Sequence, residues 1–210
     1  MEATGIILAG GQSSRMGTNK ALLKMEGKAV IERIVEELQK VVDSMMIVTN
    51  SFEEYAYLNL PMVKDEWKAM GPLAGIHAGL TASQTEKNLV VACDMPFISS
   101  ELGTLLLSQL EEDFQVVIPK ISGQLHPLFA AYRKDVKEEA QKALESDQRR
   151  IRSIFNHLKV KIMTESDLKD IGFIFQDRDF YNMNYPNEYE EAKYMIKKQK
   201  AENRNEFFSS

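Results

Sequence analysis

The stretch IILAGGQSSRMGTNKALL, residues 6–23, opens with an apolar run that predicts a buried β-strand over residues 4–8. Gly10 and Gly11 end this run, and serine and basic side chains follow within a few residues. Glycine has no Cβ, so a ligand can come close to the main chain there, and backbone amides can point at a phosphate group. The stretch therefore predicts a strand that leads into a phosphate-binding loop. The alternative is a plain glycine turn followed by solvated basic residues.

Two cations in this loop favour the phosphate interpretation. Arg15 offers a planar fork of donors and Lys20 a compact positive charge, and both suit a triphosphate. Two familiar phosphate motifs are nevertheless absent. Gly11 and Gly17 are one residue too far apart for GxxxxGK[ST], Thr18 follows where that motif requires lysine, and GxGxxG is missing. The loop would therefore be a phosphate cradle of another kind.

Beyond this stretch, apolar runs alternate with segments of helical periodicity, which predicts an α/β fold with a mainly parallel sheet between helices. No repeat, Gly/Ser linker or low-complexity tract divides the chain, so we expect a single domain over residues 1–200 and a frayed polar tail over residues 201–210. Further strands are expected over residues 45–49, 62–64, 89–93, 116–119, 128–132 and 160–163. Helices are expected over residues 31–42, 71–82, 99–110, 135–144, 150–157 and 187–200.

The composition limits the partners of the protein. The net charge of −5 over 210 residues argues against a general nucleic-acid binder. No stretch has the length and apolar character needed to span a bilayer, and the N-terminus lacks the features of a signal peptide. A single cysteine, Cys93, excludes an internal disulfide and a multi-thiolate zinc site. We therefore expect a cytoplasmic protein that binds neither nucleic acid nor membrane.

A second loop at a strand end carries a carboxylate. In VVACDMPFIS, an apolar strand delivers Asp94 to its carboxyl end and Pro96 turns the chain. Ligands of open parallel sheets bind beyond the carboxyl ends of the strands, where the glycine loop also lies. A carboxylate there can hold Mg²⁺, although aspartate also often starts a turn. The pairing with a phosphate loop favours the metal, and Cys93 is expected on the opposite face as a buried core residue.

Four segments together resemble the molybdenum cofactor guanylyltransferase family: LAGGQSSRMGTNKALL, GPLAGIHAGL, CDMPFIS and NMNYPNEYEEA. The first is similar to the signature loop of nucleotidyltransferases in general, and the union of the four points to this family. The likeness runs over residues 4–192. It implies a three-layer, Rossmann-like, mainly parallel sheet of the nucleotidyltransferase type. It also implies transfer of GMP from GTP to the terminal phosphate of molybdopterin, with Mg²⁺ as cofactor and molybdoenzyme apoproteins or their chaperones as partners.

The resemblance also implies roles for individual residues. Molybdopterin would contact Asn182 and Asn184 of an N-x-N motif, in which Tyr185 replaces the usual threonine. The basic cluster RRIR at residues 149–152 is either a solvated helix start or an anchor for molybdopterin through Arg150. The implied catalytic residues are Arg15, Lys20 and Asp94, with Asp94 binding Mg²⁺. The implied GTP-binding residues are Leu8, Ala9, Gly10, Gly11, Lys20, Asn50, Asp65 and Asp94.

Three other functions remain open at this point. A molybdopterin cytidylyltransferase or a sugar- or alditol-phosphate nucleotidyltransferase would share the fold and differ in a few pocket residues. A non-catalytic module that delivers cofactor to a molybdoenzyme belongs to another class. Arg15, Lys20 and Asp94 together argue against such a carrier, because it has no need of groups that bind metal and pyrophosphate.

Overall fold

The centre of the molecule is an eight-stranded sheet with the strand order β10-β7-β9-β6-β1-β4-β5, in which β8 pairs with β7. The structure is a computed structural model that describes residues 2–10, 19–67 and 70–207, and only the main chain of Asp177 and of residues 199–207. The strands are β1 (Ala3–Leu8), β4 (Ser44–Val48), β5 (Met62–Val63), β6 (Lys87–Ala92), β7 (Val116–Ile121), β8 (Gln124–Leu125), β9 (Phe129–Arg133) and β10 (Val160–Thr164).

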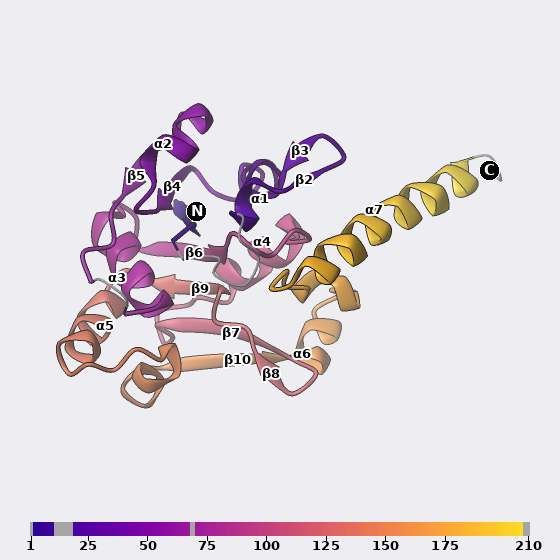
Figure 1. Cartoon of the computed structure of the whole chain (residues 1–210). Coiled ribbons are helices and arrows are strands. Elements are labelled where there is room, and N and C mark those ends of the chain that lie inside the picture. The colour runs from indigo at the N-terminus through magenta and orange to yellow at the C-terminus, as the bar shows by residue number, and fades with distance from the viewer. Residues whose placement is uncertain (1, 11–18, 68–69, 208–210) are drawn as a thin grey trace.

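Most of this sheet is parallel, as predicted. β1 pairs in parallel with both β4 and β6, β4 with β5, and β7 with β10. β9 is antiparallel to its neighbours β6 and β7. The carboxyl ends of β1, β4, β5 and β6 therefore lie at one edge of the sheet (Figure 1).

Helices cover both faces of the sheet, and alternate side chains of β1 enter the two resulting cores. Ile7 belongs to the core under α1 and α4, whereas Ile6 and Leu8 belong to the core under α3 and α5. This is the expected three-layer arrangement (Figure 1). The first layer holds α1 (Val30–Leu38), α4 (Ser100–Ser108), α6 (Glu165–Asp170) and α7 (Pro186–Phe207), and the second holds α3 (Pro72–Ala82), α5 (Val136–Glu145) and the 3-10 helix η3 (Ile151–His157).

Two glycines allow α3 to lie close against β1. A Cβ on Gly79 would meet Ile6 Cγ2 at 2.4 Å, and a Cβ on Gly75 would meet Leu8 Cδ2 at 3.2 Å. Real side chains essentially never approach at the first distance. The small residues therefore bring the start of α3 to the carboxyl end of β1.

The expected strands and helices are present, with differences at their ends. Residues 150–157 were expected to form an α-helix, and η3 is a 3-10 helix instead. The polar tail expected from residue 201 is helical as far as Phe207. After Pro186 the sequence of α7 contains neither proline nor glycine and is rich in Lys and Glu, so nothing ends the helix at residue 200.

Several short elements were not predicted. They are η1 (Lys20–Leu22), the hairpin of β2 (Lys24–Met25) and β3 (Lys28–Ala29), α2 (Phe52–Tyr55), η2 (Ala56–Leu58), β8, α6 and η4 (Asp177–Phe180). Among the residues that the structure describes, no helix combines the length and the apolar character that a membrane span requires.

Candidate functional site

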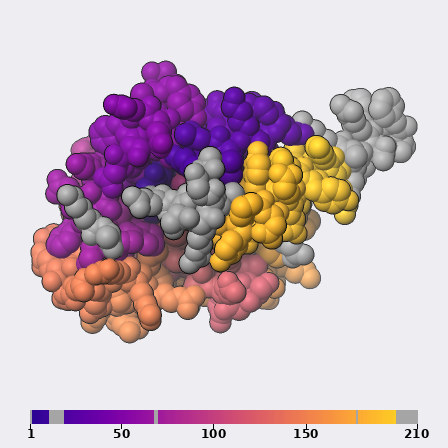
Figure 2. Space-filling view, viewed as in Figure 1, coloured from indigo at the N-terminus to yellow at the C-terminus, as the bar shows by residue number. Residues whose placement is uncertain are grey.

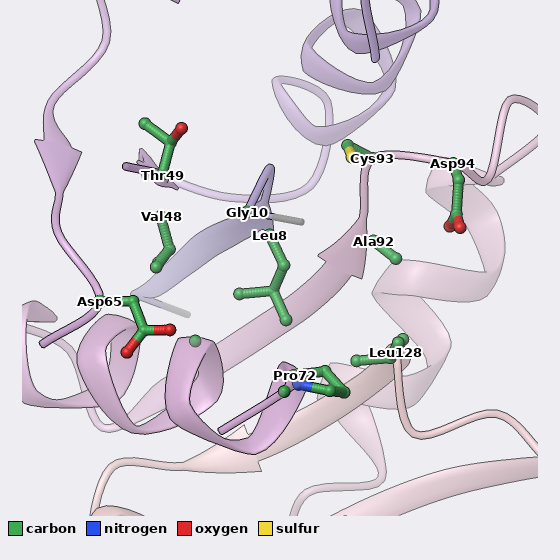
Figure 3. Close-up of a pocket in the computed structure, with 12 residues that line it drawn as sticks. Leu8, Gly10, Val48, Thr49, Asp65, Pro72, Ala92, Cys93, Asp94 and Leu128 are labelled. Atoms are coloured by element: carbon green, nitrogen blue, oxygen red, sulfur yellow. The ribbon is translucent and has the colours of Figure 1, made fainter. Parts of the chain in front are cut away.

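A pocket opens at the edge of the sheet where β1, β4 and β6 end (Figure 3). Main-chain hydrogen bonds hold these ends in register: Ala9 N donates to Val48 O at 2.9 Å, and Cys93 N donates to Leu8 O at 3.1 Å. The cavity has a volume of about 150 Å³. Its lining residues are Leu8, Gly10, Val48, Thr49, Asp65, Gly71, Pro72, Gly75, Ala92, Cys93, Asp94 and Leu128.

The two carboxylates of the pocket lie on opposite sides of it, with Leu8 between them (Figure 3). Asp94 follows β6, and Asp65 follows β5. Oδ1 of Asp65 accepts a hydrogen bond from Trp67 N at 2.9 Å. Burial raises the pKa of Asp65 and outweighs the opposite effects of this bond and of nearby His77. The pocket therefore has a carboxylate at each end. Asp65 can accept hydrogen bonds from a base or a ribose, whereas Asp94 needs a cation between itself and a phosphate group.

Lys20 and Asn184 meet beside Asp94, although they are 164 positions apart in the sequence. Lys20 Nζ donates a hydrogen bond to Asn184 Oδ1 at 3.0 Å and lies 4.0 Å from Asp94 Oδ2. Met183 N, next to Asn184, donates to the main-chain oxygen of Asp94 at 3.0 Å. The structure thus brings together three of the residues that the sequence singled out.

The surroundings of Asp94 suit a bound cation. Burial raises the pKa of its carboxyl group, Lys20 lowers it, and the negative charge of Glu188 raises it further, so that the net shift is upward. A carboxylate whose charge is disfavoured by burial gains free energy from a nearby metal ion. In the described part of the chain, no three or more His, Cys, Asp or Glu side chains cluster to form a metal cage. Asp94 could hold Mg²⁺ together with substrate phosphates and water, which is how this ion is often bound.

The start of η1 is held by a buried tyrosine that sequence reasoning missed. Asn19 Oδ1 accepts a hydrogen bond from Ala21 N at 3.1 Å and so caps the 3-10 helix that begins with Lys20. Asn19 Nδ2 donates to the hydroxyl of Tyr55 at 2.8 Å, and this hydroxyl donates to Ala9 O at 3.5 Å. Tyr55 comes from α2 and is 1% exposed. Its hydroxyl therefore links the residue after β1 to the residue before Lys20.

The other predicted site residues fall in different places. Gly10 lines the pocket, whereas Gly11 and Arg15 lie outside the described residues. Asn50 is exposed and follows Thr49, a pocket residue that the sequence did not single out. Thr49 is 1% exposed, and its position directly after β4 is the signal that could have identified it.

Cys93, predicted to be a buried core residue, packs against the core under α1 and α4 but is not fully buried. It is half-buried and lines the pocket, because β6 ends at Ala92. Its side chain points away from that of Asp94, as expected (Figure 3). Burial raises the pKa of the thiol to about 12.

None of the three residues implied to bind molybdopterin lines this pocket, although Asn184 contacts Lys20 beside Asp94. Asn182 is half-buried, and its Nδ2 donates to Phe180 O at 3.4 Å. Arg150 is exposed and lines a separate cavity of about 400 Å³ between α5 and η3. The main chain next to Arg150 lies near the pocket residue Gly71, since a Cβ on Gly71 would lie 3.6 Å from Arg149 O.

Ligands of open, mainly parallel sheets bind beyond the carboxyl ends of the strands, which is where this protein places Lys20 and Asp94. The family model of the MobA-like NTP transferase domain matches residues 5–162, more than half of the chain. The class of the protein is therefore nucleotidyltransferase.

Similar proteins narrow this class. The chain is 36% identical to a "Probable molybdenum cofactor guanylyltransferase" of Clostridium perfringens (strain SM101), over 91% of this chain and 96% of the relative. It is 33% identical to the "Molybdenum cofactor guanylyltransferase" of Desulfosudis oleivorans, over 92% and 96%. The crystal structure of molybdopterin-guanine dinucleotide biosynthesis protein A from Archaeoglobus fulgidus is similar with a TM-score of 0.74 and 25% identity, over 93% of this chain and 99% of the other. The chain belongs to the molybdenum cofactor guanylyltransferase family.

Proposed function

We propose that the protein transfers GMP from GTP to the terminal phosphate of molybdopterin, forming molybdenum guanine dinucleotide and pyrophosphate. The observation that carries the proposal is that Lys20 and Asn184 meet beside Asp94, which lines the pocket. Family membership supports guanine as the base and molybdopterin as the acceptor. Residues 1–200 are proposed to form the single domain that carries this activity.

The proposed GTP site uses both sides of the pocket. Asp65 would accept hydrogen bonds from the nucleoside, and its partly buried position between β5 and α3 supports this role. The glycine at the end of β1 lets the nucleotide contact the main chain closely. The complete set assigned to GTP is Leu8, Ala9, Gly10, Gly11, Lys20, Asn50, Asp65 and Asp94, with Arg15 beside the phosphates.

The chemistry asks the protein mainly to position two polyanions. A phosphate oxygen of molybdopterin bonds to the α-phosphorus of GTP, and the bond from this phosphorus to the oxygen that bridges to the β-phosphate breaks. The nucleophile is already a phosphate, so no strong general base is needed. Lys20 would neutralise charge that develops on the leaving pyrophosphate. Orientation of the two substrates would supply much of the remaining acceleration.

Asp94 is the proposed ligand of Mg²⁺. When bound, the ion would polarise the phosphoryl group and reduce the repulsion between the two substrates. Asn184 would orient the ammonium group of Lys20 beside Asp94. Asn182 and Arg150 are proposed for the molybdopterin end. Arg150 lines a cavity of its own, and the neighbouring Arg149 lies near Gly71 of the GTP pocket, which supports a second substrate in that place.

The experiment that tests the proposal is pyrophosphate release by the purified protein with molybdopterin and each of GTP, CTP, UTP and ATP, with Mg²⁺ or with EDTA. We expect release with GTP, dependent on Mg²⁺. Release with CTP would assign the protein to cytidylyl transfer instead. Nucleotide binding by calorimetry without any release would favour a carrier.

Two variants connect this activity to the site. Lys20→Ala is expected to weaken Mg·GTP binding at least tenfold, because charge-assisted hydrogen bonds to phosphate are strong. Lys24→Ala is the matched control, since Lys24 is exposed on the neighbouring hairpin. Equal affinities in both variants would contradict the assignment of Lys20.

A further inference from the structure

The segment from Met183 to Tyr185 touches both charged residues of the proposed site. Met183 N donates to the main-chain oxygen of Asp94 at 3.0 Å. Asn184 Oδ1 accepts the hydrogen bond from Lys20 Nζ at 3.0 Å. The conformation of this segment therefore decides where the ammonium of Lys20 lies relative to the carboxylate of Asp94.

One side chain fixes the main chain of this segment. Glu188 Oε2 accepts hydrogen bonds from both Asn184 N and Tyr185 N, the latter at 2.9 Å. Glu188 is the third residue of α7, a position from which a carboxylate can reach back to the amides before the helix. Tyr185, which precedes the helix, has no short polar side chain of the type that caps helix starts. The cap of α7 therefore depends on Glu188.

Contacts with the rest of the fold hold the start of α7, and with it the Glu188 carboxylate, in place. Tyr189 Oη donates to Lys24 O on the N-terminal hairpin at 2.5 Å, and Tyr181 Oη donates to Glu188 O at 3.1 Å. Ala192 and Ile196, one and two turns further on, are buried in the core. Figure 2 shows the C-terminal helix, in yellow, packed beside the N-terminal part of the chain, in indigo.

The distance between Lys20 Nζ and Asp94 Oδ2 affects how well each of these two groups can bind a ligand. At 4.0 Å the two charges attract each other without forming a close ion pair. Asn184 accepts one of the three hydrogen atoms of the ammonium group and holds the group in place. If Asn184 moved, Lys20 could close onto Asp94, and each charge would then compete with the ligand of the other.

We propose that Glu188 is a positioning residue of the transfer reaction, which holds the main chain of Asn184 and Tyr185 so that Asn184 keeps Lys20 apart from Asp94. The inference rests on the proposed function. It adds to that function a residue that does not line the pocket.

The test compares Glu188→Gln, Glu188→Asp and Glu188→Ala with Glu191→Gln. Glu191 is the matched control, because it lies on the same helix one turn further and accepts a hydrogen bond from Tyr181 Oη at 2.7 Å. We would measure kcat, KM for each substrate, the Kd of Mg·GTP by calorimetry, and Tm. A neutral amide accepts weaker hydrogen bonds than a carboxylate, so Glu188→Gln is expected to lower kcat or the affinity for Mg·GTP by about tenfold.

The pattern of kcat, Kd and Tm across these variants distinguishes a positioning role of Glu188 from a role in stability alone. Glu188→Asp keeps the charge and is expected to retain most activity, Glu188→Ala to lose the most, and Glu191→Gln to resemble the wild type. KM for molybdopterin should change less than kcat. Wild-type kcat and Kd in Glu188→Gln, with a Tm shift equal to that of Glu191→Gln, would overturn the inference, even if Glu188→Ala fails to fold. A wild-type protein that neither binds Mg·GTP nor releases pyrophosphate would overturn the proposed function, and this inference with it.

Discussion

Lys20 Nζ and Asp94 Oδ2 lie 4.0 Å apart, with 15% and 26% of their side chains exposed. This separation is longer than the roughly 2.7–2.9 Å of a charge-assisted hydrogen bond. Each group therefore keeps part of its capacity for a ligand: the ammonium for phosphate, and the carboxylate for a cation. The pair is placed by the ends of two elements, η1 and β6, and by Asn184 from the far end of the chain.

Asp94→Asn should abolish pyrophosphate release and leave the melting temperature equal to or above that of the wild type. Burial raises the pKa of the Asp94 carboxyl, so its charge is costly in the folded protein, and an amide of the same shape avoids this cost. Melting curves with and without Mg·GTP provide the measurement. Ligand binding should raise the Tm of the wild type and not that of the variant. A variant with more than half of the wild-type activity would rule out the proposed metal role.

Tyr55→Phe should weaken Mg·GTP binding several-fold while the protein stays folded. The phenyl ring preserves the packing, but Asn19 Nδ2 and Ala9 O lose their common partner. A buried polar group without a partner costs about 1–3 kcal/mol, and part of this is expected as misplacement of Lys20. Tyr57→Phe, at an exposed tyrosine on η2, is the control for calorimetry and melting. Lower stability with an unchanged Kd would show that Tyr55 serves the fold alone.

The sequence alone predicts the main strands of the sheet and predicts that Lys20 and Asp94 lie in one site. The strands that end at Leu8 and Ala92 finish in continuous apolar runs. The rule that ligands bind beyond the carboxyl ends of parallel strands then predicts that Lys20 and Asp94 share a site. Short elements were not predicted, because they contain too few residues to form a recognisable pattern. The hairpin of β2 and β3 has two residues in each strand, too few to show a period.

Contacts between distant segments could not be read from local patterns. The hydrogen bond from Lys20 to Asn184 joins residues 164 positions apart, and only the family resemblance pointed to Asn184. No motif in the sequence singled out Tyr55, since its role depends on the position of its hydroxyl relative to Asn19. Side-chain geometry of this kind is fixed by packing across the whole fold, which a periodicity does not encode.

Gly79→Ala should destabilise the protein by about 1–3 kcal/mol through overpacking. In an exposed helix the same change would be favourable by about 1 kcal/mol. Here the new Cβ would lie 2.4 Å from Ile6 Cγ2 and 3.3 Å from Val48 Cγ2, in the layer between α3 and the sheet. Urea unfolding measures the difference. Gly75→Ala is the milder comparison, because its Cβ would meet only the flexible end of Leu8, at 3.2 Å. A gain in stability for Gly79→Ala would contradict this close packing.

Glu37→Gln should destabilise the protein at neutral pH and much less in acid. Burial raises the pKa of Glu37, but hydrogen bonds from Lys40 Nζ at 2.5 Å and Ser100 N at 3.1 Å outweigh it, so the net pKa lies below its usual value of 4.5. A lowered pKa in the folded state means stability that is fully present above the unfolded pKa and is lost as the pH falls through the folded one.

Urea unfolding of the wild type and of Glu37→Gln at pH 7 and at about pH 3.5 measures this effect, because most of the contribution is lost near and below the carboxyl pKa. The difference in the free energy of unfolding should be largest at pH 7 and shrink in acid. Other carboxylates titrate in the same range, but their contributions cancel when the two proteins are compared. Glu36→Gln, which removes an exposed pair with Lys28, should change stability by less than about 1 kcal/mol at pH 7. If the difference in the free energy of unfolding between wild type and Glu37→Gln grew as the pH fell, burial would control the pKa of this carboxylate, and not its hydrogen bonds from Lys40 and Ser100.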